Sequence, residues 1–228
     1  MNAIVYFSNT NQSKRIAEYL SMKTGYPLLD VSSAPKKEYN RLVVVFPVYC
    51  QNAPTPIKEF LSNCQADYLA LLATYGKMWH GNVLNELQRN YKKPIICGAY
   101  IPCKHSYLSD ITFEEFEKLS PILEKILDNA PSSIRFPKTF KNPLADFSPN
   151  FRSRLGVKIK RTNNCNQCRF CEDNCPFHAI ENGKTNKRCI RCLRCVENCP
   201  KNALTFQLSL PLRLYLKKKK CEKIVIYV

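Results

Sequence analysis

The chain has 228 residues, of which 45% are hydrophobic, and this content supports a buried core and excludes a largely disordered protein. Six glycines against 15 prolines exclude collagen-like and glycine-rich low-complexity classes. The net charge is +17, with 14 Lys and Arg against 12 Asp and Glu in residues 1–133 and 21 against 6 in residues 134–228, so we expect two segments of different chemistry.

Apolar runs and helical patterns alternate along residues 1–133. We expect strands at 3–7, 28–31, 42–46, 68–73 and 95–100, and the run at 42–46 is continuously apolar, as in a parallel strand covered on both faces. Helices are expected at 13–22, after Pro54, at 83–87 and at 112–130. Five strands alternating with helices predict an α/β fold with a doubly wound, five-stranded parallel sheet.

The loop after the first strand has the composition of an anion site. It opens directly into a helix, so hydroxyl groups, loop N–H groups and the helix N-terminus meet there. Its residues are Ser8, Asn9, Thr10, Asn11, Gln12 and Ser13. The alternative is that this loop only caps the helix, in a sheet that binds nothing.

Two further loops follow the third and fourth strands, at the edge where such sheets bind ligands. They are rich in amide, aromatic and small residues, which suit a flat ring. The candidate contacts are Pro47, Val48, Tyr49 and Asn52 in the first loop, and Thr74, Tyr75, Gly76 and Trp79 in the second. The aromatic residues among them could equally be structural.

These three loops resemble those of the flavodoxin family. The family's phosphate motif is S/T-x-T-G-x-T/S, and Ser8, Thr10 and Ser13 match it, with Asn11 in place of the usual glycine. Asn tolerates the left-handed backbone conformation that glycine adopts there. The resemblance covers residues 1–133 and implies a flavodoxin-like domain that binds FMN.

Residues 134–159 read as a connector, with Pro137, Pro143 and Pro149 along it. The chain beyond it contains a duplication. The spacing C-x2-C-x2-C-x3-C-P occurs twice, 24 residues apart, first at Cys165, Cys168, Cys171 and Cys175, and then at Cys189, Cys192, Cys195 and Cys199. Each short loop can supply three thiolates to a compact metal–sulfur core, so a fourth must come from elsewhere.

Residues 160–207 resemble bacterial ferredoxins with two [4Fe–4S] clusters. In that pattern the cysteine before proline ligates the other cluster. The resemblance therefore implies one cluster on Cys165, Cys168, Cys171 and Cys199, and a second on Cys189, Cys192, Cys195 and Cys175. Two zinc sites, a disulfide scaffold and purely structural clusters are the alternatives.

A basic tail at 208–228 fits neither family. It contains the run Lys217–Lys220, whose simplest interpretation is a solvated face, and an apolar end at 224–227 that could form a strand. The cysteines outside the two motifs are expected to be free thiols.

The two resemblances together imply a cytoplasmic electron-transfer protein of anaerobic type. It would pass electrons between an external carrier, the clusters and FMN. The alternatives are an FMN-dependent reductase of a small substrate and a redox sensor or nucleic-acid binder with structural clusters. The positive charge predicts an acidic redox partner such as a ferredoxin, flavodoxin or oxidoreductase. We expect no nucleic-acid partner. We also expect no membrane span, because no apolar run reaches about 18 residues.

Overall fold

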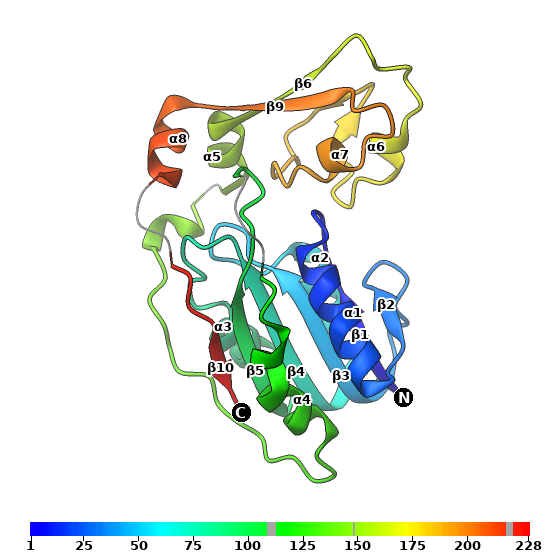
Figure 1. The fold of residues 1–228 in the computed structure, drawn as a ribbon, viewed down its shortest axis with the longest axis vertical. Helices are drawn as coiled ribbons and strands as arrows, with labels where there is room; N and C mark the ends of the chain where they lie inside the picture. Colours follow the sequence, from blue (N-terminus) through cyan, green and yellow to red (C-terminus); the bar gives the residue numbers. More distant parts are fainter. Residues whose placement is uncertain (109–112, 148, 218–220) are drawn as a thin grey trace. The chain divides into compact units, whose positions relative to one another are not determined.

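The computed structural model describes residues 1–108, 113–147, 149–217 and 221–228. The chain forms two compact units, one made of Met1–Asn142 with Lys220–Val228 and the other of Pro143–Lys219 (Figure 1). The second unit is therefore an insertion, and the last residues of the chain return to the first unit. Sequence reasoning placed residues 134–142 in a connector and treated 208–228 as a separate tail.

The first unit is built on a six-stranded sheet in the order β10-β5-β4-β3-β1-β2. The expected parallel strands are present as β1 (Asn2–Tyr6), β2 (Leu28–Asp30), β3 (Glu38–Pro47), β4 (Gln65–Tyr75) and β5 (Ile95–Pro102). Their order, 2-1-3-4-5, is that of the flavodoxin-like doubly wound fold. The sixth strand, β10 (Val225–Tyr227), pairs antiparallel with β5. The prediction of a purely parallel five-stranded sheet is therefore wrong at this edge.

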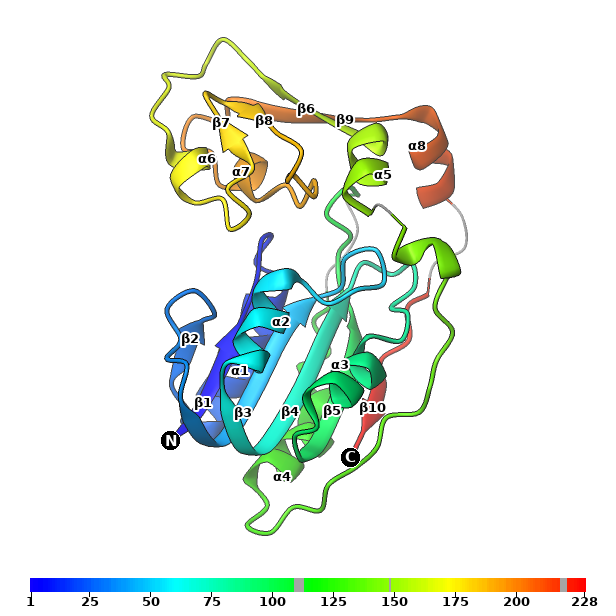
Figure 2. The same ribbon diagram turned by 180° about the vertical axis from the view of Figure 1, so that it is seen from behind.

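Helices cover both faces of this sheet (Figures 1 and 2). They are α1 (Gln12–Thr24), α2 (Thr55–Ser62), α3 (Val83–Tyr91) and α4 (Ser120–Leu127). Helices α1 and α4 pack together over one face, where Ile16 and Leu20 meet Val43 and Val45 of β3 and Ile122 of α4. Alternate residues of β3 are buried on the other face as well, which explains its continuous apolar run.

The helix predicted at 112–130 is shorter in the structure. Residues 113–115 are not helical, a 3₁₀ turn covers Phe116–Leu119, and α4 starts at Ser120 and ends at Leu127; Thr112 lies outside the described residues. Pro121 lacks an N–H group and fits only the first turn of a helix, so it sets where α4 begins. Phe113, Ile122 and Ile126 are still buried.

The second unit contains a ribbon and two small helical repeats. Strand β6 (Val157–Arg161) pairs antiparallel with β9 (Leu204–Leu208), and β7 (Ile180–Glu181) pairs with β8 (Lys184–Thr185). The helices are α5 (Pro149–Gly156), α6 (Phe170–Asp173), α7 (Arg194–Glu197) and α8 (Leu210–Leu216), with a 3₁₀ turn at Pro143–Ala145. The segments read as connector and tail thus contain α5 and α8. Lys218–Lys220 lie outside the described residues.

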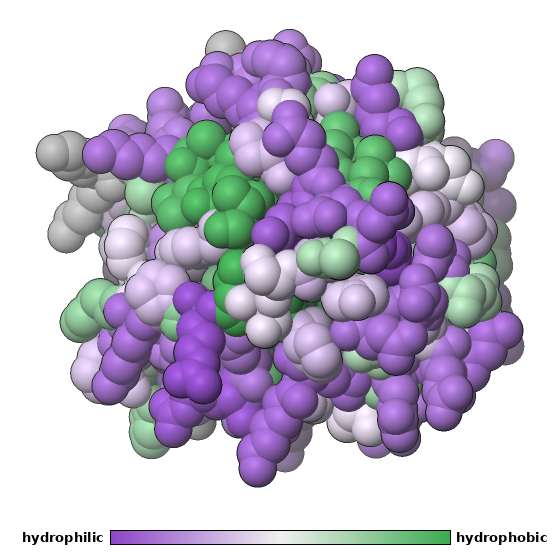
Figure 3. Space-filling view, turned by 90° about the horizontal axis from the view of Figure 1, so that it is seen from below, coloured by the Kyte–Doolittle hydropathy of each residue, from purple (hydrophilic) through white to green (hydrophobic). Residues whose placement is uncertain are grey.

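Hydrophilic side chains cover most of the face shown in Figure 3, with apolar groups between them. No helix within the described ranges is both long and apolar enough to cross a bilayer.

Candidate functional site

The loop after β1 has the backbone geometry that the sequence predicts. Asn11 adopts φ 59° and ψ 0°, the left-handed conformation, immediately before α1. This position is the one where the flavodoxin motif has glycine, and asparagine is among the few other residues that enter this region at small cost. The carbonyl of Asn11 accepts a hydrogen bond from the Arg15 N–H, so the loop leads directly into the helix.

Asn9 links this loop to the loop after β3. Its side chain is buried, and its Nδ2 donates a 2.7 Å hydrogen bond to the Tyr49 hydroxyl. Its Oδ1 is buried with no hydrogen-bond partner within the described part of the chain. A buried amide oxygen without a donor is costly unless a ligand supplies one, so Asn9 is the strongest single indication that this edge binds a polar molecule.

Ser13 and Thr74 have a role that sequence reasoning did not distinguish. Their hydroxyl oxygens are 2.8 Å apart and both residues are buried. Thr74 lies near the end of β4, so this pair ties the first turn of α1 to the neighbouring strand. Thr10 is half-buried, and Gln12 Nε2 donates to its carbonyl at 3.2 Å. Ser8 is buried at the start of the loop.

The loop after β3 is a tight turn in an uncommon conformation. Cys50 and Gln51 both have positive φ, 47° and 62°, and Tyr49 and Asn52 exchange two backbone hydrogen bonds around them. Two consecutive non-glycine residues in this region store backbone strain, a feature that clusters at ligand sites. Pro47 and Val48 are half-buried before the turn, where the Val48 N–H donates to the Thr74 carbonyl.

The loop after β4 differs from the expectation at Tyr75. Its side chain is buried, and its hydroxyl donates a 2.5 Å hydrogen bond to the carbonyl of Lys223 in the returning C-terminal segment. The Tyr75 ring is therefore buried, with its hydroxyl held by the returning segment. Gly76 is next to His105, whose ring would lie 2.6 Å from a Cβ at that position. Trp79 is partly exposed, and its Nε1 donates to the Phe140 carbonyl.

His80 anchors this loop inside a stack of rings. It is buried and lies parallel to Tyr100 at 3.6 Å and to Trp79 at 4.5 Å between ring centroids. Its Nδ1 is 2.8 Å from the Gly81 carbonyl and donates to it as the Nδ1–H tautomer. Burial lowers the pKa of His80, and the bond to Gly81 opposes that effect only in part. The ring is therefore neutral at pH 7.

We expect the stability of the first unit to fall as the pH drops below about 6.5, the ordinary pKa of histidine. Below that pH the unfolded chain protonates His80 more readily than the folded chain does, so the free energy of unfolding decreases as the pH falls. Above it His80 is neutral in both states, and its contribution to the free energy of unfolding is complete. Urea unfolding monitored by Trp79 fluorescence between pH 5 and 8 measures this slope. The variant His80→Phe keeps the ring stack and should flatten it; an unchanged slope in this variant would assign it to other groups.

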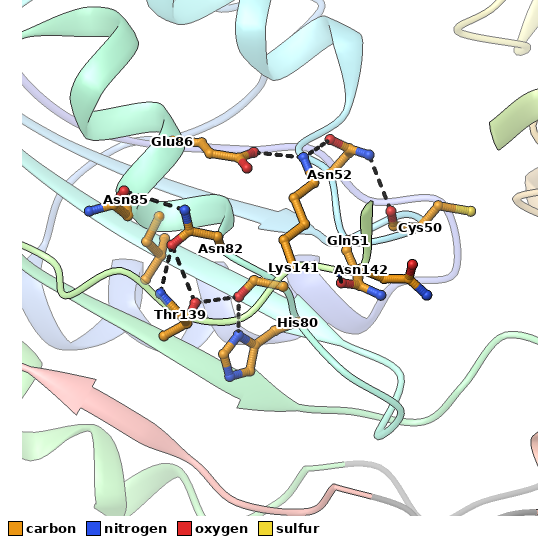
Figure 4. A network of polar contacts seen from close by, with 12 residues as sticks. Cys50, Gln51, Asn52, His80, Asn82, Asn85, Glu86, Thr139, Lys141 and Asn142 are labelled. Atoms are coloured by element: carbon orange, nitrogen blue, oxygen red, sulfur yellow. Dashed lines mark hydrogen bonds and ion pairs between the residues drawn. The ribbon is translucent and has the colours of Figure 1, made fainter. Parts of the chain in front are cut away.

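A polar network missed by sequence reasoning joins these loops to residues 139–142 (Figure 4). Lys141 Nζ donates to Asn52 Oδ1 at 2.9 Å and pairs with Glu86 of α3 at 3.0 Å. The Thr139 hydroxyl donates to the Gly81 carbonyl, and the Asn142 N–H donates to Gln51 Oε1. Thr139, Lys141 and Asn142 lie in a proline-rich segment that contains no recognisable motif. Their position just before Pro143 was the only signal in the sequence.

In the second unit the two cysteine repeats have equivalent structures. The start of α6 and the start of α7 each follow a left-handed residue, Arg169 and Leu193, which are 24 positions apart. Two equivalent backbone hydrogen bonds join the repeats. The Thr162 N–H, before the first repeat, donates to the Ala203 carbonyl after the second, and the Asn186 N–H, before the second repeat, donates to the Ala179 carbonyl after the first. This reciprocal pattern is that of a two-fold arrangement, in which the end of each repeat lies beside the beginning of the other.

Three cysteines of the first repeat and one of the second line a cavity of about 390 Å³. Its walls include Cys165, Cys168, Cys171 and Cys199. Burial raises the pKa of the Cys171 thiol, and the nearby charges of Glu172, Cys165 and Cys199 act in the same direction. Cys199 therefore lies close to the first repeat, as the exchange of the fourth ligand requires.

The second repeat shows the complementary proximity. Burial, together with nearby Cys189 and Cys175, raises the pKa of Cys192 to about 12. Burial raises the pKa of the Cys195 thiol to about 12, and the neighbouring thiols of Cys192, Cys189, Cys171 and Cys175 act in the same direction. Such thiols keep their protons at pH 7. Binding of a metal centre releases these protons, because its ligands are thiolates.

Backbone N–H groups point at one sulfur of each repeat. The Ala179 N–H donates to Cys175 Sγ at 3.4 Å, and the Ala203 N–H donates to Cys199 Sγ at 3.3 Å. Hydrogen bonds to cluster sulfurs raise the reduction potential. No group of three His, Cys, Asp or Glu side chains in the described ranges is arranged to hold a single metal ion. The support for a metal–sulfur centre therefore comes from the spacing, the cavity and the proximity of the thiols.

Comparison with known proteins bears on the second unit most directly. Residues 185–205 match the 4Fe-4S binding domain family, and this match supports at least one 4Fe-4S cluster in the second unit. The match covers the second cysteine repeat. No curated protein is similar enough to this chain to match it.

Solved structures that are similar to part of the chain include a flavodoxin and an oxidoreductase. A flavodoxin from the domain Archaea is 18% identical over 55% of this chain and 99% of its own, with a TM-score of 0.39. Rubredoxin oxygen:oxidoreductase from the anaerobe Desulfovibrio gigas is 12% identical over 54% of this chain and 34% of its own, with a TM-score of 0.40. The fold assignment given above rests on the strand order of this chain itself.

Proposed function

We propose that the chain is an electron-transfer protein that binds FMN on its first unit and two [4Fe–4S] clusters on its second. The observation that carries the proposal is the reciprocal pairing of two complete cysteine repeats in a chain whose other unit has flavodoxin-like strand order. The strand order supports FMN because this fold binds it where β1 and β3 diverge. At that point lie the left-handed Asn11 and Asn9 Oδ1, which has no hydrogen-bond partner among the residues that the structure describes.

The residues divide the work between phosphate and ring. Thr10, Asn11 and Gln12, at the N-terminus of α1, would hold the phosphate, and Asn9 would accept a hydrogen bond from the ligand. Tyr49 and Trp79 are the aromatic side chains left at the ring loops, because Tyr75 is buried. FMN supplies an acceptor for one or two electrons, whereas each cluster passes one, so the chain would convert between the two.

Cofactor analysis on one anaerobic preparation tests this function. The proposal requires about eight irons and eight acid-labile sulfides for two cubane clusters, together with one FMN per chain. About four irons would reduce the assignment to one cluster. Eight irons without flavin, even after incubation with excess FMN, would contradict the flavin assignment and leave an iron–sulfur protein.

The partner that fits the second unit is an acidic redox protein. Residues 143–219 contain 16 Lys and Arg against 5 Asp and Glu, a net charge of +11 before any cluster charge. We expect the second-order rate of electron transfer from an acidic ferredoxin to fall about tenfold or more as ionic strength rises, because salt screens electrostatic steering. Stopped-flow reduction in increasing NaCl measures this.

An uncharged small reductant gives the matched control for the salt series. Its rate should change little over the same range, which separates steering from an effect of salt on the cofactors. A rate with the acidic protein that does not depend on salt would contradict the proposed partner class.

A further inference from the structure

The two segments of the first unit that flank the insertion are fastened to the two loops assigned to the flavin ring. The chain leaves the first unit at Asn142 and returns to it at Lys220. Next to each of these points, side chains of the loops after β3 and β4 hold the chain. We define the exit clamp as Gln51, Asn52, Gly81, Asn82 and Glu86 holding Thr139–Asn142, and the return clamp as Tyr75 and Lys77 holding Cys221–Lys223.

The exit clamp is a continuous polar network (Figure 4). Lys141 is largely buried, with 15% of its side chain exposed, and bridges Asn52 at 2.9 Å to Glu86 at 3.0 Å. Gln51 Oε1 accepts from the Asn142 N–H at 2.9 Å. Gly81, at φ 70°, allows the close approach, because a Cβ there would lie 2.6 Å from Gln51 Cβ. The strained turn after β3 is thus fixed to the last residues before the insertion.

The return clamp uses a buried tyrosine that sequence reasoning assigned to the flavin. The Tyr75 hydroxyl donates to the Lys223 carbonyl at 2.5 Å and lies 3.6 Å from Cys221 Sγ. The Cys221 N–H donates to the Lys77 carbonyl at 2.6 Å, and Lys77 Nζ pairs with Glu222 at 3.3 Å. Beyond the clamp, β10 adds to the edge of β5. The return is therefore fixed at the loop after β4 and again along the sheet.

We infer that Tyr75 and Lys141 are positioning residues that fix the first-unit segments on either side of the insertion, so that the iron–sulfur unit is tethered at the flavin loops and electrons pass faster between clusters and flavin. The inference rests on the proposed function. Two short tethers keep the inserted unit at a high effective concentration near their attachment points, and releasing one lengthens the free chain. A tether of about twice the free length lowers the effective concentration roughly threefold, as the −3/2 power of length.

The test uses the full-length protein with its cofactors and the variant Tyr75→Phe. Phenylalanine keeps the buried ring and removes only the hydroxyl that holds Lys223 and Cys221. The clusters are reduced rapidly, and the first-order, concentration-independent reduction of the flavin is followed by its absorbance. We expect this rate to fall roughly threefold, with iron and FMN per chain unchanged. Hydrogen exchange of residues 221–227 should become faster in the same variant.

Tyr39→Phe is the matched control. Tyr39 is a buried tyrosine on β3, and its hydroxyl donates to the Pro35 carbonyl rather than holding the returning chain. This variant should leave the first-order rate unchanged. Lys141→Met, which opens the exit clamp, provides a second and independent variant, so that a folding defect in Tyr75→Phe does not decide the result.

The outcomes separate the inference from the function beneath it. The inference is wrong if hydrogen exchange at residues 221–227 becomes faster while the first-order rate of flavin reduction stays the same in Tyr75→Phe and in Lys141→Met. The clamps would then not position the unit. Unchanged exchange would also contradict it, because Tyr75 would not be holding the return. If the unmodified protein itself shows no first-order flavin reduction, the proposed function fails, and the inference fails with it.

Discussion

The double variant Cys175→Ala/Cys189→Ala is expected to retain about four irons per chain, whereas Cys171→Ala/Cys175→Ala is expected to lose nearly all iron. The reason is the proposed exchange of the fourth ligand between repeats. With the exchange, Cys175 and Cys189 belong to one cluster, and removing both leaves the other cluster complete. Cys171 and Cys175 then belong to different clusters, so the second double variant damages both.

Without the exchange, the two results are reversed. Each repeat would hold its own cluster, so Cys171 and Cys175 would share one and Cys175 and Cys189 would not. The structure favours the exchange, because Cys199 lines one cavity together with Cys165, Cys168 and Cys171. The reciprocal backbone bonds between repeats place the same residues together.

Iron and acid-labile sulfide per chain, measured after anaerobic purification, decide between the two patterns. Cys64→Ala is the control for loss of a thiol, because Cys64 lies outside both repeats and outside the three loops assigned to the flavin. The ratio of FMN to protein monitors folding of the first unit in every variant. Four irons retained by Cys171→Ala/Cys175→Ala, with loss in the other double variant, would overturn the exchanged assignment.

Local sequence signals predicted local structure well. The left-handed conformation of Asn11 followed from one residue standing at a glycine position of a motif, and the structure confirms it at φ 59°. The five parallel strands followed from apolar runs, because a short β-branched run such as 42–46 is typical of a strand in a sheet covered on both faces.

Long-range features were not accessible in the same way. An apolar end at 224–227 could be recognised as a strand, but its partner is β5, more than 120 positions earlier in the chain. Nothing in either segment specifies that pairing, because edge pairing uses backbone groups that every residue carries. The burial of Tyr75 depends on this returning segment, so an aromatic residue in a ligand loop could not be distinguished from a core residue.

Introducing a carboxylate in the loop after β1, by Thr10→Asp, is expected to weaken FMN binding by at least about 100-fold. The FMN phosphate carries close to two negative charges at pH 7. Two unit charges about 4 Å apart repel by several kcal/mol at the effective dielectric of a partly buried site, and Thr10 is half-buried directly before the left-handed Asn11.

Titration of the flavin-free protein with FMN and with riboflavin, followed by flavin fluorescence, measures the effect and its cause. Riboflavin has the same ring and no phosphate, so its affinity should change little in Thr10→Asp. Ser132→Asp makes the same charge change at an exposed residue outside the three loops and should leave both affinities unaltered. Equal losses for FMN and riboflavin would mean that the substitution disrupts the loop. Unchanged FMN affinity would place the phosphate elsewhere, and the assignment of residues 8–13 would be wrong.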